Sequence, residues 1–150
     1  MLEKLRALFT PPVSKTQDDA GLDVAVAALL VEAARADEVY DDRERELIDL
    51  ALAAHFNLGA EAAATLRARG EVAQAAANDL HGFTKFAKTM NGPDKVRLIE
   101  RMWEIVLSDA CRDPNEDALI RRVCGLIYVS DPESGAARRR AQAALKAGRV

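Results

Sequence analysis

Residues that carry most redox and metal chemistry are scarce in this sequence. It has two cysteines and two histidines among 150 residues, and aromatic residues make up 5%. Cys111 and Cys124 do not form a CxxC pair and are too few for a disulfide framework. We therefore expect both cysteines to be small buried apolar residues without a redox role.

Common catalytic motifs are also missing. The sequence has no phosphate-binding loop, no GxSxG and no HExxH. A di-iron bundle carries glutamate three positions before a ligating histidine, but Leu52 and Asn78 stand there. We expect His55 to lie at a helix end as a cap, and His81 to be a surface or half-buried residue. These absences favour a protein that is not an enzyme.

Long apolar runs are absent as well. No run reaches the roughly 18 residues that a membrane span needs, and Met1–Thr10 lacks the apolar core of a signal peptide. We expect a cytoplasmic protein with no membrane span. The formal net charge of −3 argues neither for nor against a polyanionic partner. A basic C-terminal stretch predicts a solvated helix face rather than a nucleic-acid site; it comprises Arg138, Arg139, Arg140, Lys146 and Arg149.

Helical periodicity is the strongest pattern that the sequence does contain. Apolar residues make up 49% of the chain and charged residues 30%. The apolar positions recur at helical spacing, with no convincing strand alternation. At this length a single core is the default. We predict an all-α fold, a single compact helical domain of about seven to eight helices over residues 1–150.

Start and stop signals divide the chain into helices. Met1–Phe9 predicts a short amphipathic helix that ends at the two prolines after it, and Asp18 or Asp19 can cap the next helix. A short alanine-rich helix is expected to stop at Gly70. The expected ranges are about 18–36, 41–56, 60–68 and 71–90, followed by helices that begin at Pro93, Asp113 and Ser130. Expected inward positions include Val72, Leu80, Phe83 and Phe86 on the long connecting helix, and Tyr128 on the helix that begins at Asp113.

Two acidic turns repeat with a constant spacing of 72 residues. Four acidic positions, and the isoleucine that follows them, keep this register while most residues between them differ. The acidic residues are Glu32, Asp37, Asp41 and Glu44 in the first copy and Glu104, Asp109, Asp113 and Glu116 in the second. We expect repeat 1 over about 18–69 and repeat 2 over about 93–147, joined by the connecting helix over about 71–91.

Helix capping explains half of these acidic residues. Asp41 and Glu44 match an N-cap aspartate followed by glutamate at the third helical position, and so do Asp113 and Glu116. Negative charge there also meets the positive end of the helix dipole. Taken alone, these four residues predict helix starts.

The other four acidic residues fall in the last turns of the preceding helices, where the dipole already presents negative charge. Arg35 can offset part of this in the first copy, but Leu107 takes its place in the second. The missing compensation points to a bound cation, with solvated caps and surface charge as the alternative. Carboxylates without histidine or thiol favour Ca²⁺, Mg²⁺ or Mn²⁺, although the spacing is not that of an EF-hand.

At these residues the chain resembles the TerB-like family, the tellurite resistance protein B type, especially its smaller uncharacterised bacterial branch. The resemblance runs over about Leu22 to Val129. It rests on Ala-Leu-Leu-x-Glu before the first turn, on Ala36-Asp37 with Glu44-x-x-x-Ile48, and on Ser108-Asp109 with Glu116-x-x-x-Ile120. The resemblance implies an all-helical fold and a divalent-cation role for the eight acidic residues. Glu38 and Ala110 stand where the common family form has glycine.

Three functions are compatible with these features. The first is a non-enzymatic cation-binding module that acts through an unidentified protein partner, in tellurite or stress resistance. The second is a metal-independent helical adaptor, whose carboxylates cap helices while an apolar face recruits a partner. The third, metal-assisted phosphoester hydrolysis, lacks a visible base and a phosphate loop. We favour the first, with no organic cofactor and no nucleic acid.

Overall fold

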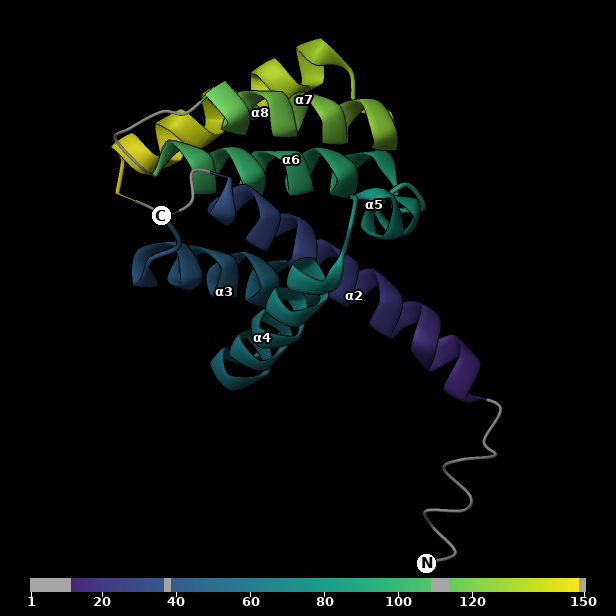
Figure 1. Ribbon diagram of the computed structural model, residues 1–150. Helices are drawn as coiled ribbons and strands as arrows, with labels where there is room; N and C mark the ends of the chain where they lie inside the picture. Colours follow the sequence, from purple (N-terminus) through teal and green to yellow (C-terminus); the bar gives the residue numbers. More distant parts are fainter. Residues whose placement is uncertain (1–11, 37–38, 109–113, 149–150) are drawn as a thin grey trace, which may run out of the picture.

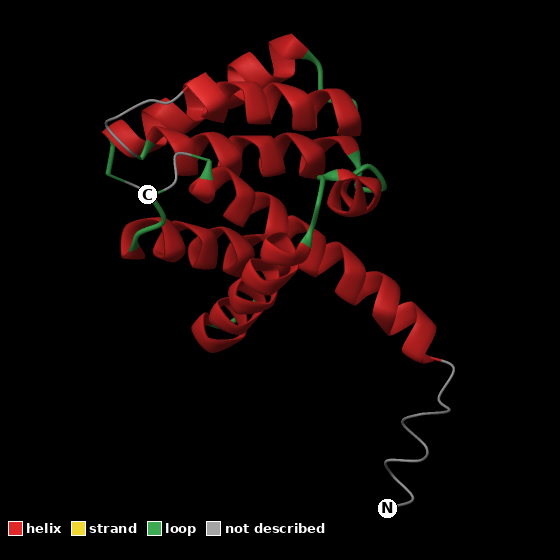
Figure 2. Cartoon of the chain, in the orientation of Figure 1, coloured by secondary structure: helices red, strands yellow, loops and turns green. Residues whose placement is uncertain are grey.

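Seven α-helices and no strand make up the part of the chain that the computed structural model describes, residues 12–36, 39–108 and 114–148 (Figure 1). The predicted all-α fold is confirmed, and Figure 2 shows helices joined by short loops. None of the described helices is long and apolar enough to cross a membrane. The helices are α2 (Pro12–Arg35), α3 (Asp42–Phe56), α4 (Ala60–Ala76), α5 (His81–Ala87), α6 (Gly92–Leu107), α7 (Pro114–Ile127) and α8 (Asp131–Lys146).

α2 is the central helix of the fold. In Figure 1, α3 and α4 lie below it and α6, α7 and α8 lie above it. α3, α4, α5, α6 and α7 all contact α2. From Ala25 to Ala34 every residue is buried except Glu32. This segment is almost entirely alanine, valine and leucine, so it is apolar on all sides, and such a helix is stable only when neighbours cover it all round.

The start of α2 differs from the prediction. The helix begins at Pro12, so Asp18 and Asp19 lie within it and do not cap it. Proline suits the first helical turn, because its missing N–H has no intrahelical partner there. The expected helix over Met1–Phe9 lies outside the described residues.

The predicted boundary at Gly70 is also wrong. α4 continues through Gly70 to Ala76, and the chain is not helical again until His81, so residues 71–90 are not one long helix. The break begins at Ala77, which is extended, and the Asp79 carboxylate then accepts a hydrogen bond from the His81 N–H at 2.9 Å. Val72, expected to face inward, is 72% exposed.

Gly70 lets α2 and α4 approach closely. A Cβ atom built on Gly70 would lie 2.6 Å from the Ala27 Cβ and 2.9 Å from the Ala27 carbonyl carbon. Backbone atoms cannot move aside as a flexible side chain can, so glycine is required at this helix crossing. Gly70 is therefore a packing residue rather than a helix stop.

Replacing Gly70 by alanine should destabilise the fold, because the added methyl group would force α4 away from α2. We expect Gly70→Ala to lower the free energy of unfolding by about 1–3 kcal/mol in urea titrations. Gly125→Ala is the matched control: Gly125 lies in α7, and a Cβ atom there meets nothing within 4 Å. The control should stabilise by about 0.5–1 kcal/mol through helix propensity alone. Equal effects of the two substitutions would contradict the packing role.

α6 and α7 supply much of the remaining core. Their apolar spacing predicts the buried side, and the structure buries Leu98, Ile99, Met102, Trp103 and Val106 on α6 and Leu119, Ile120, Val123, Cys124 and Ile127 on α7. Cys124 is therefore a buried apolar residue, as expected. Burial also raises the pKa of its thiol, which disfavours the reactive thiolate. Cys111 lies outside the described residues.

Helix bounds on either side of the two turns keep the spacing seen in the sequence. α2 and α6 end at Arg35 and Leu107, and α3 and α7 begin at Asp42 and Pro114, each pair 72 residues apart. The next helix packs back in both halves, α4 against α2 and α8 against α6. The two halves thus place their turns in corresponding positions.

α3 and α7 end in the same way. Each is followed by a residue in the left-handed conformation, Asn57 with φ 54° and Tyr128 with φ 66°. The next N–H then bonds back over five residues, from Leu58 to the Ala53 carbonyl and from Val129 to the Cys124 carbonyl, both at 2.9 Å. This is the Schellman pattern of helix termination. Tyr128 was expected to face inward, but it points outward and is 72% exposed.

Candidate functional site

The helix ends that flank the two predicted acidic turns lie at one end of the molecule. In Figure 1 the last turns of α2 and α6 and the first turns of α3 and α7 are all on the left side of the view. Five of the eight predicted ligands are described, namely Glu32, Asp41, Glu44, Glu104 and Glu116. Asp37, Asp109 and Asp113 lie outside the described residues.

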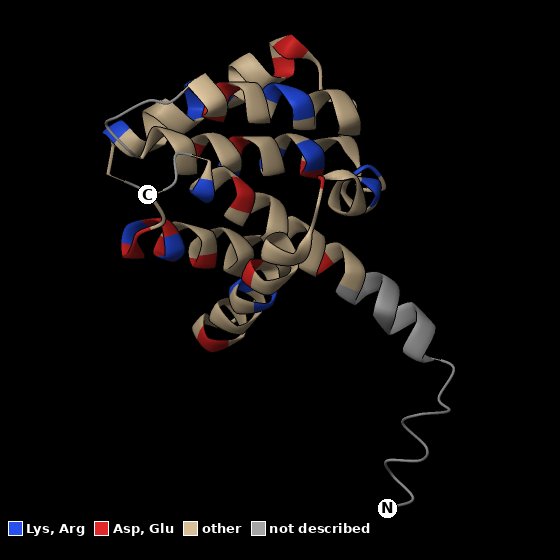
Figure 3. Ribbon diagram, viewed as in Figure 1, with Lys and Arg blue, Asp and Glu red and all other residues tan. Residues whose placement is uncertain are grey.

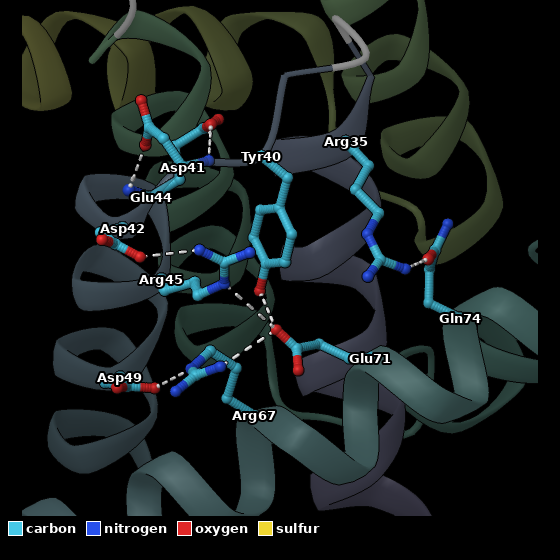
Figure 4. Close-up of polar contacts among 10 residues, drawn as sticks. All are labelled: Arg35, Tyr40, Asp41, Asp42, Glu44, Arg45, Asp49, Arg67, Glu71 and Gln74. Atoms are coloured by element: carbon cyan, nitrogen blue, oxygen red, sulfur yellow. Dashed lines mark hydrogen bonds and ion pairs between the residues drawn. The ribbon is translucent and has the colours of Figure 1, made fainter.

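Asp41 and Glu44 form the predicted capping box at the start of α3 (Figure 4). The Glu44 N–H donates to the Asp41 carboxylate at 2.9 Å, and the Asp41 N–H donates to the Glu44 carboxylate at 3.2 Å. A second capping box joins Ser130 and Glu133 at the start of α8, with the Ser130 N–H 3.0 Å from the Glu133 carboxylate. Both helices therefore begin where the sequence signal places them.

The glutamates at the third helical position differ in burial. Glu44 is 4% exposed and Glu116, the third residue of α7, is 2% exposed, whereas Glu133 is on the surface. Glu133 caps its helix in full contact with water, so capping does not require burial of the carboxylate. The burial of Glu44 and Glu116 is specific to the two acidic turns.

Glu32 and Arg35, near the end of α2, both meet Gln74 of α4. The Gln74 side-chain N–H donates to the Glu32 carboxylate at 2.6 Å, and the Arg35 guanidinium donates to the Gln74 side-chain oxygen (Figure 4 shows the latter pair). Gln74 thus links an acid and a base that lie one turn apart. Glu32 has a neutral protein partner, which sequence spacing did not reveal because Gln74 lies 42 residues away.

Glu104, the counterpart of Glu32, is 4% exposed and has an arginine partner on its own helix. One Arg101 N–H group lies 2.8 Å and 3.0 Å from the two carboxylate oxygens. Burial raises the pKa of Glu104, and the Arg101 charge opposes that rise. Leu107 stands where the first copy has Arg35. The prediction that Glu104 therefore lacks charge compensation is wrong, because Arg101 supplies it from one turn earlier.

A cavity of about 510 Å³ lies between the end of α2 and the start of α7. It is lined by Glu32, Arg35, Ala36, Asn115, Ala118, Leu119 and Arg122. Glu32 therefore faces the helix whose first turn carries Glu116. Within the described ranges, no three histidine, cysteine, aspartate or glutamate side chains lie close enough together to hold a metal ion.

A polar network around Tyr40 was not foreseen from the sequence (Figure 4). The Tyr40 hydroxyl donates to the Glu71 carboxylate, which also accepts from Arg67 at 3.0 Å. Arg67 in turn donates to the Asp49 carboxylate at 2.6 Å. The network joins the segment before α3 to α3 itself and to α4, over sequence separations of 18 and 31 residues that no local pattern reveals.

Two arginines lie against the Tyr40 ring. The guanidinium carbon of Arg35 is 4.9 Å from the ring centroid, and that of Arg45 is 4.5 Å away. Arg45 also pairs with Asp42 at 2.8 Å and lies 3.9 Å from the Glu71 carboxylate. Cation–π contacts and ion pairs thus hold the end of α2 and the start of α3 on the same tyrosine.

Glu71 is the acceptor on which this network converges. Burial raises the pKa of its carboxyl group, but hydrogen bonds from Tyr40 and Arg67 outweigh that effect, so the pKa is lower than usual. The Tyr40 pKa is raised by burial and by its bond to Glu71. Both groups therefore keep their neutral-pH charge states, a tyrosine donor and a carboxylate acceptor.

His55 lies near the end of α3, as predicted, but Asn57 and not His55 is the cap of that helix. The His55 side chain is half-buried beside a second cavity. This cavity has a volume of about 220 Å³ and is lined by Ala54, His55, Asp94, Arg97 and Arg101. Burial lowers the pKa of His55, with Asp94 opposing and the two arginines adding to the effect. His81 begins α5 and is exposed. Elsewhere, acidic and basic residues are interspersed along the helices in the view of Figure 3.

The fold and the helix ends together define a class, a small all-helical protein in which two helix–turn–helix units bury glutamates beside their turns. The chain belongs to the TerB family: the family model described as tellurite resistance protein TerB matches residues 23–139. The family resemblance inferred from the sequence is therefore confirmed. No curated protein and no solved structure matches the chain in comparable searches.

Removing the Tyr40 hydroxyl should destabilise the fold and change its response to acid. We expect Tyr40→Phe to cost about 1.5–3 kcal/mol at pH 7, because a hydrogen bond to a charged group is lost. A carboxyl group with a lowered folded-state pKa stabilises above its unfolded pKa, and that contribution is lost as pH falls through the folded value. The difference between wild type and variant should therefore shrink below about pH 4 in urea titrations.

Tyr128→Phe is the control for this substitution, because its hydroxyl belongs to an exposed side chain. It should change the free energy of unfolding by less than about 0.5 kcal/mol at either pH. A Tyr40→Phe cost that equals the control, or that does not change with pH, would contradict the role assigned to the bond with Glu71.

Proposed function

We propose that the chain is a non-enzymatic, divalent-cation-binding helical module that acts through protein partners in tellurite or stress resistance. The ion would bind at the end of the molecule that carries the two acidic turns. Membership of a family described by tellurite resistance supports the physiological context. Tellurite itself is an oxyanion that carboxylates would repel, so the proposed role runs through a cation and a partner.

The burial of Glu44 and Glu116 carries this proposal. Both occupy the third position of their helix, and both are almost inaccessible to water, whereas Glu133 occupies the same position in α8 and is exposed. Moving a carboxylate out of water is costly unless another charge or a set of donors compensates. Glu44 already accepts the hydrogen bond from the Asp41 N–H. A cation shared by the two turns would add to such contacts and would explain why burial accompanies the acidic turns and not the third helix start.

The donor chemistry fits a hard cation. Glu32, Glu44, Glu104 and Glu116 offer only carboxylate oxygens, the ligands preferred by Ca²⁺, Mg²⁺ and Mn²⁺. No three such groups come together within the described residues. The proposed site therefore also requires Asp37, Asp109 and Asp113. Asp41 is the remaining member of the predicted set of eight ligands.

A metal-independent adaptor is the second candidate, and specific contacts favour it. Gln74 bonds to Glu32, Arg101 pairs with Glu104, and Asp41 shares a capping box with Glu44. These protein groups compensate the carboxylates of Glu32, Glu104, Asp41 and Glu44 without an ion. In that case the acidic turns would set the geometry of the helices, and partner binding would not depend on metal.

Thermal unfolding with and without Ca²⁺ or Mn²⁺ separates the two candidates. A free ion at about 100 times its dissociation constant stabilises by about 2.7 kcal/mol, or about 5–10 °C for a domain of this size. We expect such a rise for wild type and its loss in the double variant Glu44→Gln with Glu116→Gln. Isothermal calorimetry with the same ions should show the same loss of binding.

Glu133→Gln is the matched control. Glutamine keeps the capping reach at the third helical position, so all three substitutions alter helix starts similarly. Only those at the acidic turns remove a proposed ligand. If wild type shows no metal-dependent stabilisation, or if Glu133→Gln abolishes it as fully as the double variant does, the cation proposal fails and the adaptor is favoured.

A further inference from the structure

We propose that Tyr128, Lys88 and Lys95 form a docking surface for an acidic segment of a protein partner. In this complex an apolar side chain of the segment covers the Tyr128 ring, and carboxylates of the segment pair with the two lysines. We call these three residues the Tyr128 surface. They come from the end of α7, the end of α5 and the first turns of α6.

The backbone at Tyr128 does not favour tyrosine. This residue has φ 66°, a conformation that L-residues with bulky side chains rarely adopt and that glycine or asparagine adopts readily. Helix α3 ends in the same hydrogen-bonded pattern with Asn57 in that position. Helix termination therefore accounts for the backbone at residue 128 but not for an aromatic side chain there.

Packing does not account for the tyrosine either. Its side chain is 72% exposed, and among the large exposed hydrophobic residues of the described chain it is the only aromatic one. The neighbouring Val129 is buried and supplies the apolar contact typical of this helix ending. A local rule broken without a structural gain is typical of a functional position.

Two ammonium groups accompany the ring. The Lys88 Nζ is 5.3 Å from the ring centroid and the Lys95 Nζ is 6.0 Å away, so the two charges lie within about 11 Å of one another. Neither lysine takes part in an ion pair with any described residue, in contrast to Arg97 and Arg101 on the same helix as Lys95. A cation–π contact at an exposed site contributes little, so both charges remain available to an anionic partner.

The surroundings favour an acidic protein segment over a polyanion. Nucleic acid requires an extended basic stripe, since its affinity comes from many phosphate contacts. Here the positive charge is limited to two lysines, the chain as a whole has a formal net charge of −3, and Asp131 and Glu133 follow a few residues after Tyr128. Two carboxylates and one apolar side chain match the size and charge of the Tyr128 surface, and tyrosine is enriched where proteins bind one another.

The Tyr128 surface lies away from the acidic turns. α7 has Glu116 in its first turn and Tyr128 just after its last residue, so the proposed cation region and the docking surface are at opposite ends of this helix. α5 lies at the opposite side of Figure 1 from the first turn of α3. The inference rests on the proposed function only in that the chain acts through protein partners; it does not require the ion.

A displayed library of random twelve-residue peptides, selected on the whole chain in EDTA, tests the proposal. Sequences enriched on wild type should combine two or more acidic residues with an aromatic or aliphatic residue. Enrichment should be lost on Tyr128→Ala and on the double variant Lys88→Gln with Lys95→Gln. If wild type enriches no acidic peptides beyond the level seen on these variants, the docking surface does not exist.

Binding of the most enriched peptide, measured by fluorescence anisotropy, gives the second readout. We expect Tyr128→Ala to weaken it at least about tenfold, as loss of a central aromatic contact does at protein interfaces. Tyr128→Asn should abolish binding while raising the urea midpoint of unfolding, because asparagine tolerates the left-handed backbone. Retained peptide binding in Tyr128→Asn would overturn the assignment. It would also be overturned if circular dichroism showed that only unfolded variants lose peptide binding.

Other occupants give distinct results. Binding of a twelve-residue oligothymidylate, or of vesicles containing a quarter phosphatidylserine, more tightly than the acidic peptide would replace the proposal with a polyanion or membrane site. A concentration-dependent dimer in sedimentation velocity that is lost in Tyr128→Ala would identify the partner as a second copy. The double variant Glu44→Gln with Glu116→Gln should keep peptide binding, which distinguishes failure of the docking surface from failure of the cation proposal.

Discussion

The burial of α2 on all sides is the constraint on which the rest of this structure depends. A helix of alanine, valine and leucine has little side-chain volume, so its neighbours must come close to exclude water from it. At the crossing with α4 the approach leaves no room for a Cβ atom on Gly70, next to Ala27. α3, which lies between α2 and α4 in sequence, contacts both of them, so the packing of α4 on α2 also fixes where the first turn of α3 lies.

Polar contacts around Tyr40 then connect the end of α2 to α3 and α4. Tyr40 lies between Arg35 and Arg45 and bonds to Glu71, so one aromatic side chain connects the end of α2, the start of α3 and the middle of α4. The pattern is not repeated in the second half, where residue 112, 72 positions after Tyr40, is an arginine. The two halves therefore share a buried glutamate at the third helical position, whereas the tyrosine that bonds to Glu71 belongs to the first half alone.

Local chemistry explains which parts of the fold the sequence predicts. Caps at Asp41 and Ser130 act through atoms three residues away, so their motifs identify the starts of α3 and α8. α6 begins at Gly92, one residue before the predicted Pro93, with Asn91 as its cap. The core positions of α6 and α7 follow from helical spacing. Gly70 was misjudged because its role depends on Ala27, a contact between distant segments, and glycine alone does not distinguish a helix stop from a close crossing.

The candidate site is predictable to a similar degree. The repeated spacing of the acidic residues predicts that helices end and begin at corresponding positions in the two halves, and the helix bounds agree. In the structure these helix ends lie on one side of the molecule (Figure 1). The partners of these carboxylates were not predictable in the same way. Gln74 reaches Glu32 from another helix, and Arg101 reaches Glu104 from one turn earlier in α6. Charge compensation is a three-dimensional property, so a missing basic residue in an aligned position does not show that a carboxylate lacks one.

The two ends of α7 show how a structural requirement can be separated from a functional one within a single chain. At its start Glu116 is buried, although Glu133 shows that a helix can be capped by an exposed glutamate. At its end Tyr128 is exposed in a strained conformation, although Asn57 shows that the same ending forms with a residue suited to it. In each case another helix of this protein forms the same kind of start or ending with a more usual residue, an exposed glutamate at the start of α8 and an asparagine at the end of α3. What remains after that comparison, a buried carboxylate and an exposed aromatic ring, is what the capping of a helix start and the left-handed ending of a helix do not by themselves explain.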